Sequence, residues 1–248
     1  SYMSSLEKIR IERCIFDDCQ GRNSRAIFCN LFTQNFTFFN NTIQNFSPFG
    51  SQEDSTGYLF VFEFPTTSTE FVVDSIIFRN LTTDSDFGGG CGLWIKSRQM
   101  KRYTLHFKSC IFEDCHAVSN GKVTRECSNG RGGALQFGWT PSISDVDMVI
   151  SNCEFIRNVA DLDGGALCIM IQNNVEITQC KFTDNKAGAS TPDQDQNFGG
   201  AIAIYPNYEY GNHRYSEFIH IDGCTFSGNI GNNANAIFIQ DASNSDIY

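Results

Sequence analysis

Apolar and polar residues alternate along this chain in one short motif that recurs seven times. The motif has an apolar pair at alternate positions, two further residues, a small core residue, Phe two positions later, and usually Asn or Cys three positions after the Phe. It first occurs over residues 9–19 (IRIERCIFDDC) and last over residues 219–229 (IHIDGCTFSGN). Alternation with a period of two predicts short strands, and regular recurrence predicts a repeat architecture.

A second motif, Gly-Gly-Ala followed by alternating apolar residues, comes after each copy of the first. The shortest gaps are ten residues from Phe16 to Ala26 and twelve from Ala26 to Phe38, so the minimum coil has 10 + 12 = 22 residues. Three short strands then fit each coil, and crossovers between parallel strands are right-handed. We therefore predict an all-β fold, a right-handed parallel β-helix of about seven coils with three short parallel sheets, forming a single domain over residues 1–248. The clearest Gly-Gly-Ala copies are residues 132–137, 164–169 and 199–204.

Cysteine occupies the small core position of the first motif in five copies, while Phe36 and Ile76 fill it in the other two. A position that exchanges Cys for Phe and Ile belongs to an apolar core, where free Cys acts as a small hydrophobe. Strands about 4.8 Å apart with parallel side chains suit disulfide geometry poorly. We expect a mostly reduced cysteine stack that contains Cys14, Cys110, Cys153, Cys180 and Cys224.

We assign a structural role, and no catalytic or binding role, to the Asn after the Phe and to the Gly-Gly pair. Asn tolerates left-handed backbone and can hydrogen-bond to the Asn of the next coil, and Gly permits close approach of neighbouring coils. Cys19, Leu81 and Cys115 interrupt the expected Asn ladder of Asn41, Asn158, Asn185 and Asn229.

Charge and hydropathy narrow the classes of partner. A formal net charge of −10 without a basic stripe argues against nucleic-acid binding. No apolar run is long enough for a transmembrane span. The chain opens inside the first repeat and offers no capping element at either end. We therefore expect a piece of a longer chain, with ends continued by further chain or covered by a partner.

The chain offers little catalytic chemistry. Its acidic pairs are single residues on solvated faces or in loops, many coils apart, whereas glycoside hydrolysis needs two carboxyls across one bond. We expect no enzyme, no cofactor and no zinc site, because the Cys and His spacings lack a second ligand pair. A Ca²⁺ site in the loop 186–198 has no support beyond its acidic residues. The pairs are Asp17/Asp18, Glu113/Asp114, Asp161/Asp163 and Asp193/Asp195.

The third sheet holds the candidate binding surface. Four of its seven predicted outward positions are aromatic, namely Phe28, Phe60, Trp94 and Phe238, alongside Gln136, Cys168 and Ala203. A contiguous apolar stripe of this kind is typical of an interface. The alternative is that the loops 42–56, 116–131 and 205–216 fold back over it. The full candidate set adds Trp139 and the loop tyrosines Tyr205, Tyr208 and Tyr210.

The two motifs resemble the repeats of chlamydial polymorphic membrane proteins and related β-helix surface proteins, some of them in protists, within the pectin lyase-like group of folds. The matching segments are 38–41, 155–158, 182–185 and 226–229, together with the three Gly-Gly-Ala copies. The resemblance implies a surface-exposed adhesin or passenger domain.

Three functions follow from these observations. The leading hypothesis is a non-catalytic binding or adhesion module that presents a side face and loops to a protein or glycan, at the cell surface or secreted. The second is a structural component of a multi-protein assembly, docked through the outer face of the third sheet and the open ends. A reduced cysteine ladder would suit an intracellular assembly of this kind. The third is a polysaccharide lyase or hydrolase of the pectin lyase-like type.

Overall fold

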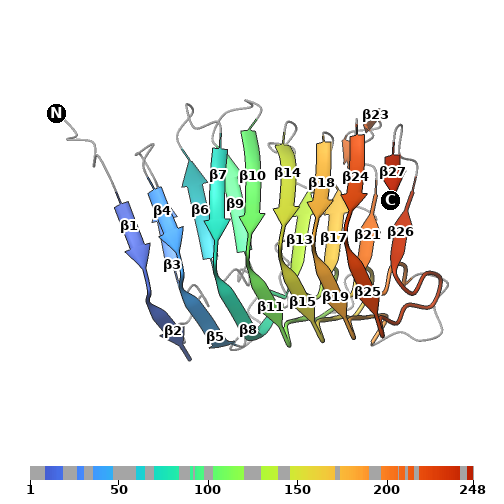
Figure 1. The fold of residues 1–248 in the computed structure, drawn as a ribbon, viewed down its shortest axis with the longest axis horizontal. Coiled ribbons are helices and arrows are strands. Elements are labelled where there is room, and N and C mark those ends of the chain that lie inside the picture. Colours follow the sequence, from blue (N-terminus) through green and yellow to red (C-terminus); the bar gives the residue numbers. More distant parts are fainter. Residues whose placement is uncertain are drawn as a thin grey trace.

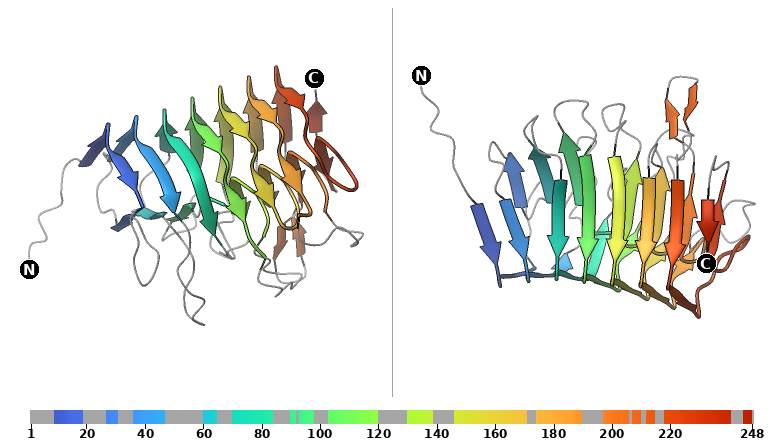
Figure 2. Two further views of the ribbon diagram at one scale, coloured as in Figure 1. Left: turned by 90° about the horizontal axis from the view of Figure 1, so that it is seen from below. Right: turned by 45° about the horizontal axis from the view of Figure 1, so that its top comes forward.

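The structure is a computed structural model, and it is a right-handed parallel β-helix whose coils stack along the long axis of the molecule (Figures 1 and 2). Three sheets of parallel strands run along this axis in sequence order. The described residues are 9–18, 27–30, 36–46, 60–64, 70–83, 90–91, 93–97, 103–119, 130–138, 146–170, 174–189, 197–205, 207–209, 212–214, 218–240 and 245–247.

Sheet 1 contains the strands that begin each coil. Its side chains alternate between the core and the solvent, as in Asn174–Thr178, where Val175 and Ile177 are buried and Glu176 is exposed. The strands in order are β1 (Ile9–Glu12), β4 (Phe36–Phe39), β7 (Glu70–Asp74), β10 (Tyr103–Lys108), β14 (Val146–Ser151), β18 (Asn174–Thr178), β24 (Phe218–Asp222) and β27 (Ser245–Ile247).

Sheet 2 follows sheet 1 after a sharp corner. Its strands are β2 (Ile15–Asp17), β5 (Thr42–Phe46), β8 (Ile77–Thr83), β11 (Ile111–Glu113), β15 (Glu154–Ile156), β19 (Lys181–Thr183) and β25 (Thr225–Ser227). The second residue of each of these strands faces inward, and it is Phe in every strand except β5, where it is Ile43. After a second corner, the end of β8 pairs with β12 (His116–Ala117). Strand β12 pairs in turn with β16 (Val159–Ala160), and β16 pairs with β20 (Lys186–Ala187).

Sheet 3 closes each coil and is described in two blocks. The first block is β3 (Ile27–Asn30), β6 (Phe60–Phe64) and β9 (Leu93–Ser97), and the second is β13 (Leu135–Gly138), β17 (Leu167–Met170), β21 (Ile202–Ile204) and β26 (Ile237–Ile239). An antiparallel hairpin, β22 (Asn207–Glu209) and β23 (Asn212–Arg214), stands apart from the three sheets (Figure 2).

The two corners on either side of each sheet 2 strand have left-handed backbone. The two residues of each pair are five positions apart, and all have φ between 46° and 65°. Four residues lie between the two corners, and the third of them, which is Phe in all but the second coil, faces the interior. The pairs are Arg13/Asp18, Asn40/Asn45, Ser75/Asn80, Ser109/Asp114, Asn152/Arg157, Gln179/Asp184 and Gly223/Gly228.

Stacked phenylalanine rings form the centre of the core. The rings of successive coils lie 4.8–4.9 Å apart between centroids and within 5° of parallel. Parallel, in-register strands impose this spacing, so each inward side chain lies on the equivalent side chain of the next coil. The stack contains Phe78, Phe112, Phe155, Phe182 and Phe226.

The register predicted for the second coil is wrong by five residues. Phe38 pairs with Ile11 in sheet 1, so it does not occupy the Phe position of sheet 2, where Ile43 pairs with Phe16. Asn41 therefore occupies the place of Cys14 that the sequence pattern assigned to Phe36. Its side chain is buried and bonded, accepting from the Cys14 N–H at 2.9 Å and donating to the Ile11 carbonyl at 2.9 Å.

The cause of this error is a local ambiguity in the sequence. Asn40 and Asn45 both adopt the left-handed conformation, and apolar residues alternate on both sides of each. The pattern therefore fits two registers, and only the alignment with the neighbouring coils selects one. As a result Phe46, and not Asn41, occupies the second-corner row beside Leu81.

We expect Phe155→Ala to lower the free energy of unfolding by about 3–5 kcal/mol, because the truncation opens a cavity inside the phenylalanine stack. Ile156→Ala is the matched control, since its side chain is in the same strand and faces outward. Its expected cost is below about 1 kcal/mol. Urea unfolding followed by circular dichroism measures both, and equal costs for the two variants would contradict the assigned register.

Candidate functional site

The predicted binding residues fall into three groups. Tyr205 and Phe238 lie close together beside the second block of sheet 3. Phe28, Phe60, Trp94 and Tyr208 lie in strands β3, β6, β9 and β22, whose backbone alone is described. Trp139 and Tyr210 lie outside the described residues.

The predicted aromatic row of the first block needs a correction. Phe28 pairs with Val61, and Val61 pairs with Trp94, so these three residues share one row across β3, β6 and β9. Phe60 lies in the neighbouring row, between Ile27 and Leu93. Alternation alone does not show which residues of Phe60–Phe64 belong to the predicted outward row, because Phe occupies positions 60, 62 and 64.

The predicted outward row of the second block is correct in register, but it is buried. Gln136, Cys168, Ala203 and Phe238 are consecutive partners across the four strands. Gln136 is 3% exposed, and Cys168 and Ala203 are fully buried. In this block the structure therefore follows the second alternative, in which the chain covers its own stripe.

Four residues, Arg131, Asp163, Phe198 and Tyr205, make up this cover, which we call the sheet 3 cover. The ring of Phe198 stacks on Phe238 with a centroid distance of 4.2 Å, and the Tyr205 ring lies 5.6 Å from Phe238. Tyr205 and Arg131 belong to segments that the sequence suggested as covers. Phe198 was missed, although it is the one aromatic residue just before a Gly-Gly-Ala copy.

Within the sheet 3 cover, Asp163 binds Arg131 and Phe198 through its buried carboxylate. Its Oδ1 accepts the backbone N–H groups of Asn197 at 3.1 Å and Phe198 at 2.9 Å, and its Oδ2 lies 3.0 Å from the Arg131 Nε. The Arg131 guanidinium in turn lies over the Tyr205 ring, 5.4 Å from its centroid. The carboxylate is 2% exposed, so the arginine supplies the charge compensation that a buried anion requires.

The Tyr205 phenol in the sheet 3 cover and the Cys168 thiol in the row beneath it are held in their neutral forms. Burial raises the pKa of Cys168 to about 12 and raises the pKa of the Tyr205 phenol well above its ordinary range. A thiol and a phenol that stay protonated near neutral pH are poor nucleophiles. This cluster is therefore suited to holding a segment in place.

The second predicted acidic residue of this region, Asp161, is also engaged by the fold. Its Oδ2 accepts the backbone N–H of Ser119 at 2.8 Å, and its Oδ1 lies 2.9 Å from the His116 Nε2. Asp161 and Asp163 are both nearly inaccessible. Asp193 and Asp195 lie outside the described residues.

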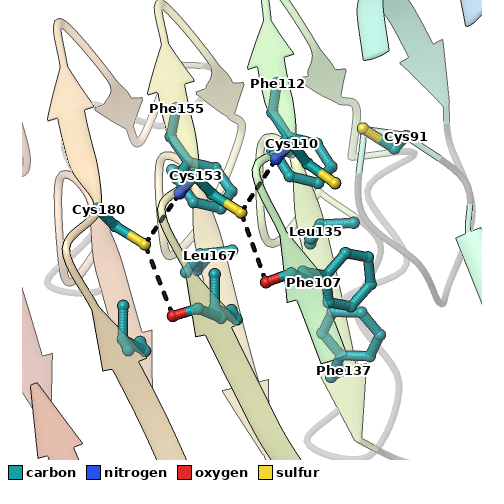
Figure 3. Packing of buried hydrophobic residues seen from close by; sticks show 14 of the residues in the cluster. Cys91, Phe107, Cys110, Phe112, Leu135, Phe137, Cys153, Phe155, Leu167 and Cys180 are labelled. Carbon is teal, nitrogen blue, oxygen red and sulfur yellow. Dashed lines mark hydrogen bonds between the residues drawn. The ribbon is translucent and has the colours of Figure 1, made fainter. Parts of the chain in front are cut away.

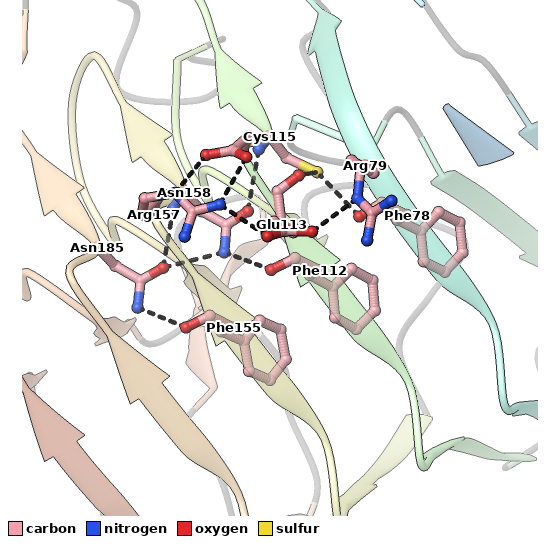
Figure 4. Close-up of polar contacts among 10 residues, drawn as sticks. Phe78, Arg79, Phe112, Glu113, Cys115, Phe155, Arg157, Asn158 and Asn185 are labelled. Carbon is pink, nitrogen blue, oxygen red and sulfur yellow. Dashed lines mark hydrogen bonds and ion pairs between the residues drawn. The ribbon is translucent and has the colours of Figure 1, made fainter. Parts of the chain in front are cut away.

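An accessible network of ion pairs lies on the outer face of sheet 2. Glu113 is flanked by two arginines, with Arg79 Nε at 2.6 Å and Arg157 Nη2 at 2.7 Å, and Arg157 Nε also reaches Asp114 at 2.8 Å (Figure 4). The two arginine side chains are about half exposed, at 47% and 49%. From the sequence alone Glu113 and Asp114 are predicted to be isolated solvated residues, because Arg79 and Arg157 lie 34 and 44 residues from Glu113 along the chain.

Isoleucines adjoin this charged network. Ile77 and Ile111 are neighbours in the same outward row, and Ile156 is the partner of Glu113 in the next row. Each is partly accessible. The first row contains Ile15, Thr42, Ile77, Ile111, Glu154, Lys181 and Thr225. The second row contains Asp17, Gln44, Arg79, Glu113, Ile156, Thr183 and Ser227.

Hydrogen bonds from Arg157 and Arg79 to Glu113 hold the pKa of that carboxyl below its ordinary value. A lowered pKa in the folded state means that the ionised network stabilises the fold at neutral pH. The network is half exposed, so its contribution is screened by water and salt.

Cysteine and asparagine form two ladders inside the helix. The backbone N–H of Cys110 donates to the Cys153 sulfur at 3.4 Å, and the Cys153 N–H donates to the Cys180 sulfur at 3.4 Å (Figure 3). At the second corner, Asn158 donates its Nδ2 to the Phe112 carbonyl and to the Asn185 Oδ1 (Figure 4). The eight cysteines whose side chains are described are free thiols in the structure.

Two further searches concern only the described residues. Within those segments, no group of three or more His, Cys, Asp or Glu side chains is placed to hold a metal ion. The same part of the chain has no helix with the length and apolar character needed to cross a membrane.

Comparison of the chain with protein-family models, curated protein sequences and solved structures gives no significant match. The functional argument therefore depends on the residues and geometry described above.

We expect Asp163→Asn to lower the free energy of unfolding by about 3–5 kcal/mol, because it leaves the Arg131 guanidinium without its charged partner in a buried place. Asp114→Asn removes a half-exposed ion pair and should cost less than about 1 kcal/mol. Chemical denaturation of both variants tests this difference. A cost for Asp163→Asn as small as that of the control would show that the negative charge of Asp163 is not needed to hold the sheet 3 cover.

We expect the Glu113 carboxyl to titrate below its ordinary pKa of about 4.3. Its stabilising effect should be complete above that pH and be lost as the pH falls through the lowered pKa. Arg157→Gln should raise the Glu113 pKa towards the ordinary value, and Arg79→Gln should raise it less. Carboxyl-carbon NMR titration measures all three midpoints, and an unchanged midpoint in Arg157→Gln would contradict the proposed origin of the shift.

Proposed function

We propose that this protein is a non-catalytic binding module, a β-helical rod that presents a side face to a partner. The main support is the middle of the sheet 2 outer face. There Ile77, Ile111 and Ile156 lie beside the Arg79–Glu113–Arg157 network on an accessible surface. By contrast, the outer face of the second sheet 3 block is already covered by the chain's own residues.

The composition of this face favours a protein as the partner. Interfaces between proteins are enriched in Arg, and the anchoring side chains combine apolar area with polar ends. The charges are balanced, with three cationic groups (Arg79, Arg157, Lys181) against three anionic groups (Glu113, Asp114, Glu154). Ion pairs within the face also hold the arginines in place, which reduces the side-chain entropy lost on binding.

A glycan partner has a separate basis in sheet 3. Phe28 and Trp94 share one row of the first block, two strands apart. Aromatic rings offer an apolar body for stacking on sugar rings. The glycan form of the proposal therefore predicts dependence on Trp94 and not on the isoleucines of sheet 2.

The resemblance to β-helix surface proteins supports the adhesin form of this proposal. Of the four Phe-x-x-Asn copies, those at 155–158, 182–185 and 226–229 lie at equivalent corners. The three Gly-Gly-Ala copies also share one place in the coil. We propose the cell surface or the exterior as its location. The eight described free thiols support the alternative of a component of an intracellular assembly.

A cross-linking experiment tests the protein form. A photoreactive residue at position 111 should capture one partner reproducibly from an extract of the source cells, and the same residue at position 176, on sheet 1, should not. The purified partner should then bind the double variant Ile111→Thr/Arg79→Gln about tenfold more weakly. These replacements occur naturally in the same two rows, as Thr42 and Gln44, so the fold should persist.

The control for this loss is Val149→Thr, an outward substitution on sheet 1, which should leave affinity unchanged. A glycan array that reports binding abolished by Trp94→Ala would replace the protein form with the glycan form. Cleavage of an acidic polysaccharide by the purified chain, abolished by an acidic-residue variant, would overturn the binding module altogether.

A further inference from the structure

Cys91 occupies a place that later coils fill with alanine. Its backbone N–H donates to the Ala134 carbonyl at 2.9 Å, and Ala134 donates in the same way to Ala166. This row continues through Ala201 to Ala236. Cys91 is thus the Ala position of a Gly-Gly-Ala motif, and it is fully buried.

Cys115 occupies a place that later coils fill with asparagine. It follows the second left-handed corner, and its backbone N–H donates to the Asn158 Oδ1 at 3.1 Å. The same row continues with Asn185 and Asn229. Cys115 is also fully buried.

These two rows meet at the boundary between successive coils. Gly90, just before β9, lies against the backbone of His116 in the following coil, as Gly133 lies against Val159 one coil further on. Cys91 and Cys115 are therefore neighbours across one coil boundary, and Ala134 and Asn158 hold the equivalent places at the next boundary. Both members of the pair are cysteine at the same boundary.

The two sulfurs lie within reach of each other. The Cys91 and Cys115 Sγ atoms are 3.5 Å apart. In the ladder, the Cys153 and Cys180 sulfurs each accept the backbone N–H of the preceding cysteine, and the Cys110, Cys153 and Cys180 thiols donate to backbone carbonyls. Figure 3 shows Cys91 to one side of that ladder.

We propose that Cys91 and Cys115 form an internal dithiol that a hydroperoxide oxidises to a disulfide, joining two successive coils. In the first step, the thiolate of one cysteine attacks a peroxide oxygen, which gives a sulfenic acid and releases water. The second thiol then attacks the sulfenic sulfur and releases a second water. Two thiols and one hydrogen peroxide thus give one disulfide and two waters.

The fold controls the rate of this modification. Burial, reinforced by the hydrogen bond between the two thiols, raises the pKa of Cys91 far above its ordinary value. The thiolate is the reactive form, so oxidation of the folded protein at neutral pH should be slow and should accelerate as the pH rises. This inference is independent of the proposed binding function.

The disulfide can be detected unambiguously by mass spectrometry. The folded chain is treated with hydrogen peroxide at pH 7 and pH 9, remaining thiols are blocked, and the unreduced protein is cut with trypsin and Glu-C. Cys91 is then the single cysteine of peptide 80–96, Cys115 of peptide 114–122 and Cys110 of peptide 109–113. We expect 80–96 joined to 114–122 as the dominant linked product, formed more than about tenfold faster at pH 9, because the thiolate fraction rises with pH.

Two variants supply the controls. Cys91→Ala and Cys115→Asn each restore the residue of the later coils, and each should abolish the linked product while keeping the circular dichroism spectrum. Cys153→Ala alters the ladder and should leave the product unchanged. Failure to form the link at either pH, or linkage of 80–96 to 109–113 in equal amount, would overturn the inference.

Discussion

The whole structure depends on two left-handed backbone residues, five positions apart, in every coil. Twelve of the fourteen corner residues are not glycine, and each such residue costs about 1–2 kcal/mol in an isolated chain. Stacking offsets this cost, because the N–H groups of these residues donate to carbonyls of the next coil, as from Ser109 to Ser151 and from Arg157 to Thr183. The corners and the stack thus stabilise each other, and neither is expected to persist alone.

This constraint explains why the core accepts polar and sulfur-containing residues. The residue after each corner faces a backbone N–H of the preceding coil that has no strand partner. Asn158 and Asn185 satisfy that N–H with an amide oxygen, and Cys153 and Cys180 satisfy it with a sulfur. Asn41 does the same in the second coil. These residue types are interchangeable because each supplies an acceptor.

The fold was predictable from the sequence because the two motifs recur with their corners in phase. The second coil was not, since Asn40 and Asn45 permit two registers and only coil-to-coil pairing distinguishes them. The phase of Phe60 was open for a similar reason. The sheet 3 cover involves Arg131, Asp163 and Phe198, each just before a Gly-Gly-Ala copy, but the three side chains share no chemical type, so the repeat pattern does not predict their contacts. The Arg79–Glu113–Arg157 network was not predicted, because its three residues come from three successive coils and meet only when the coils are stacked.

The ladders also determine how the molecule would respond to a pulling force. Each coil is bonded only to its neighbours, so extension from one end should peel off one coil at a time. The chain length between successive ladder rungs is 43 residues from Cys110 to Cys153, 27 from Cys153 to Cys180, and 44 from Cys180 to Cys224. At about 3.4 Å per residue, these coils would release about 15, 9 and 15 nm of chain. The uneven loops between regular rungs thus give the rod a mechanical signature in which a short step lies between two long ones.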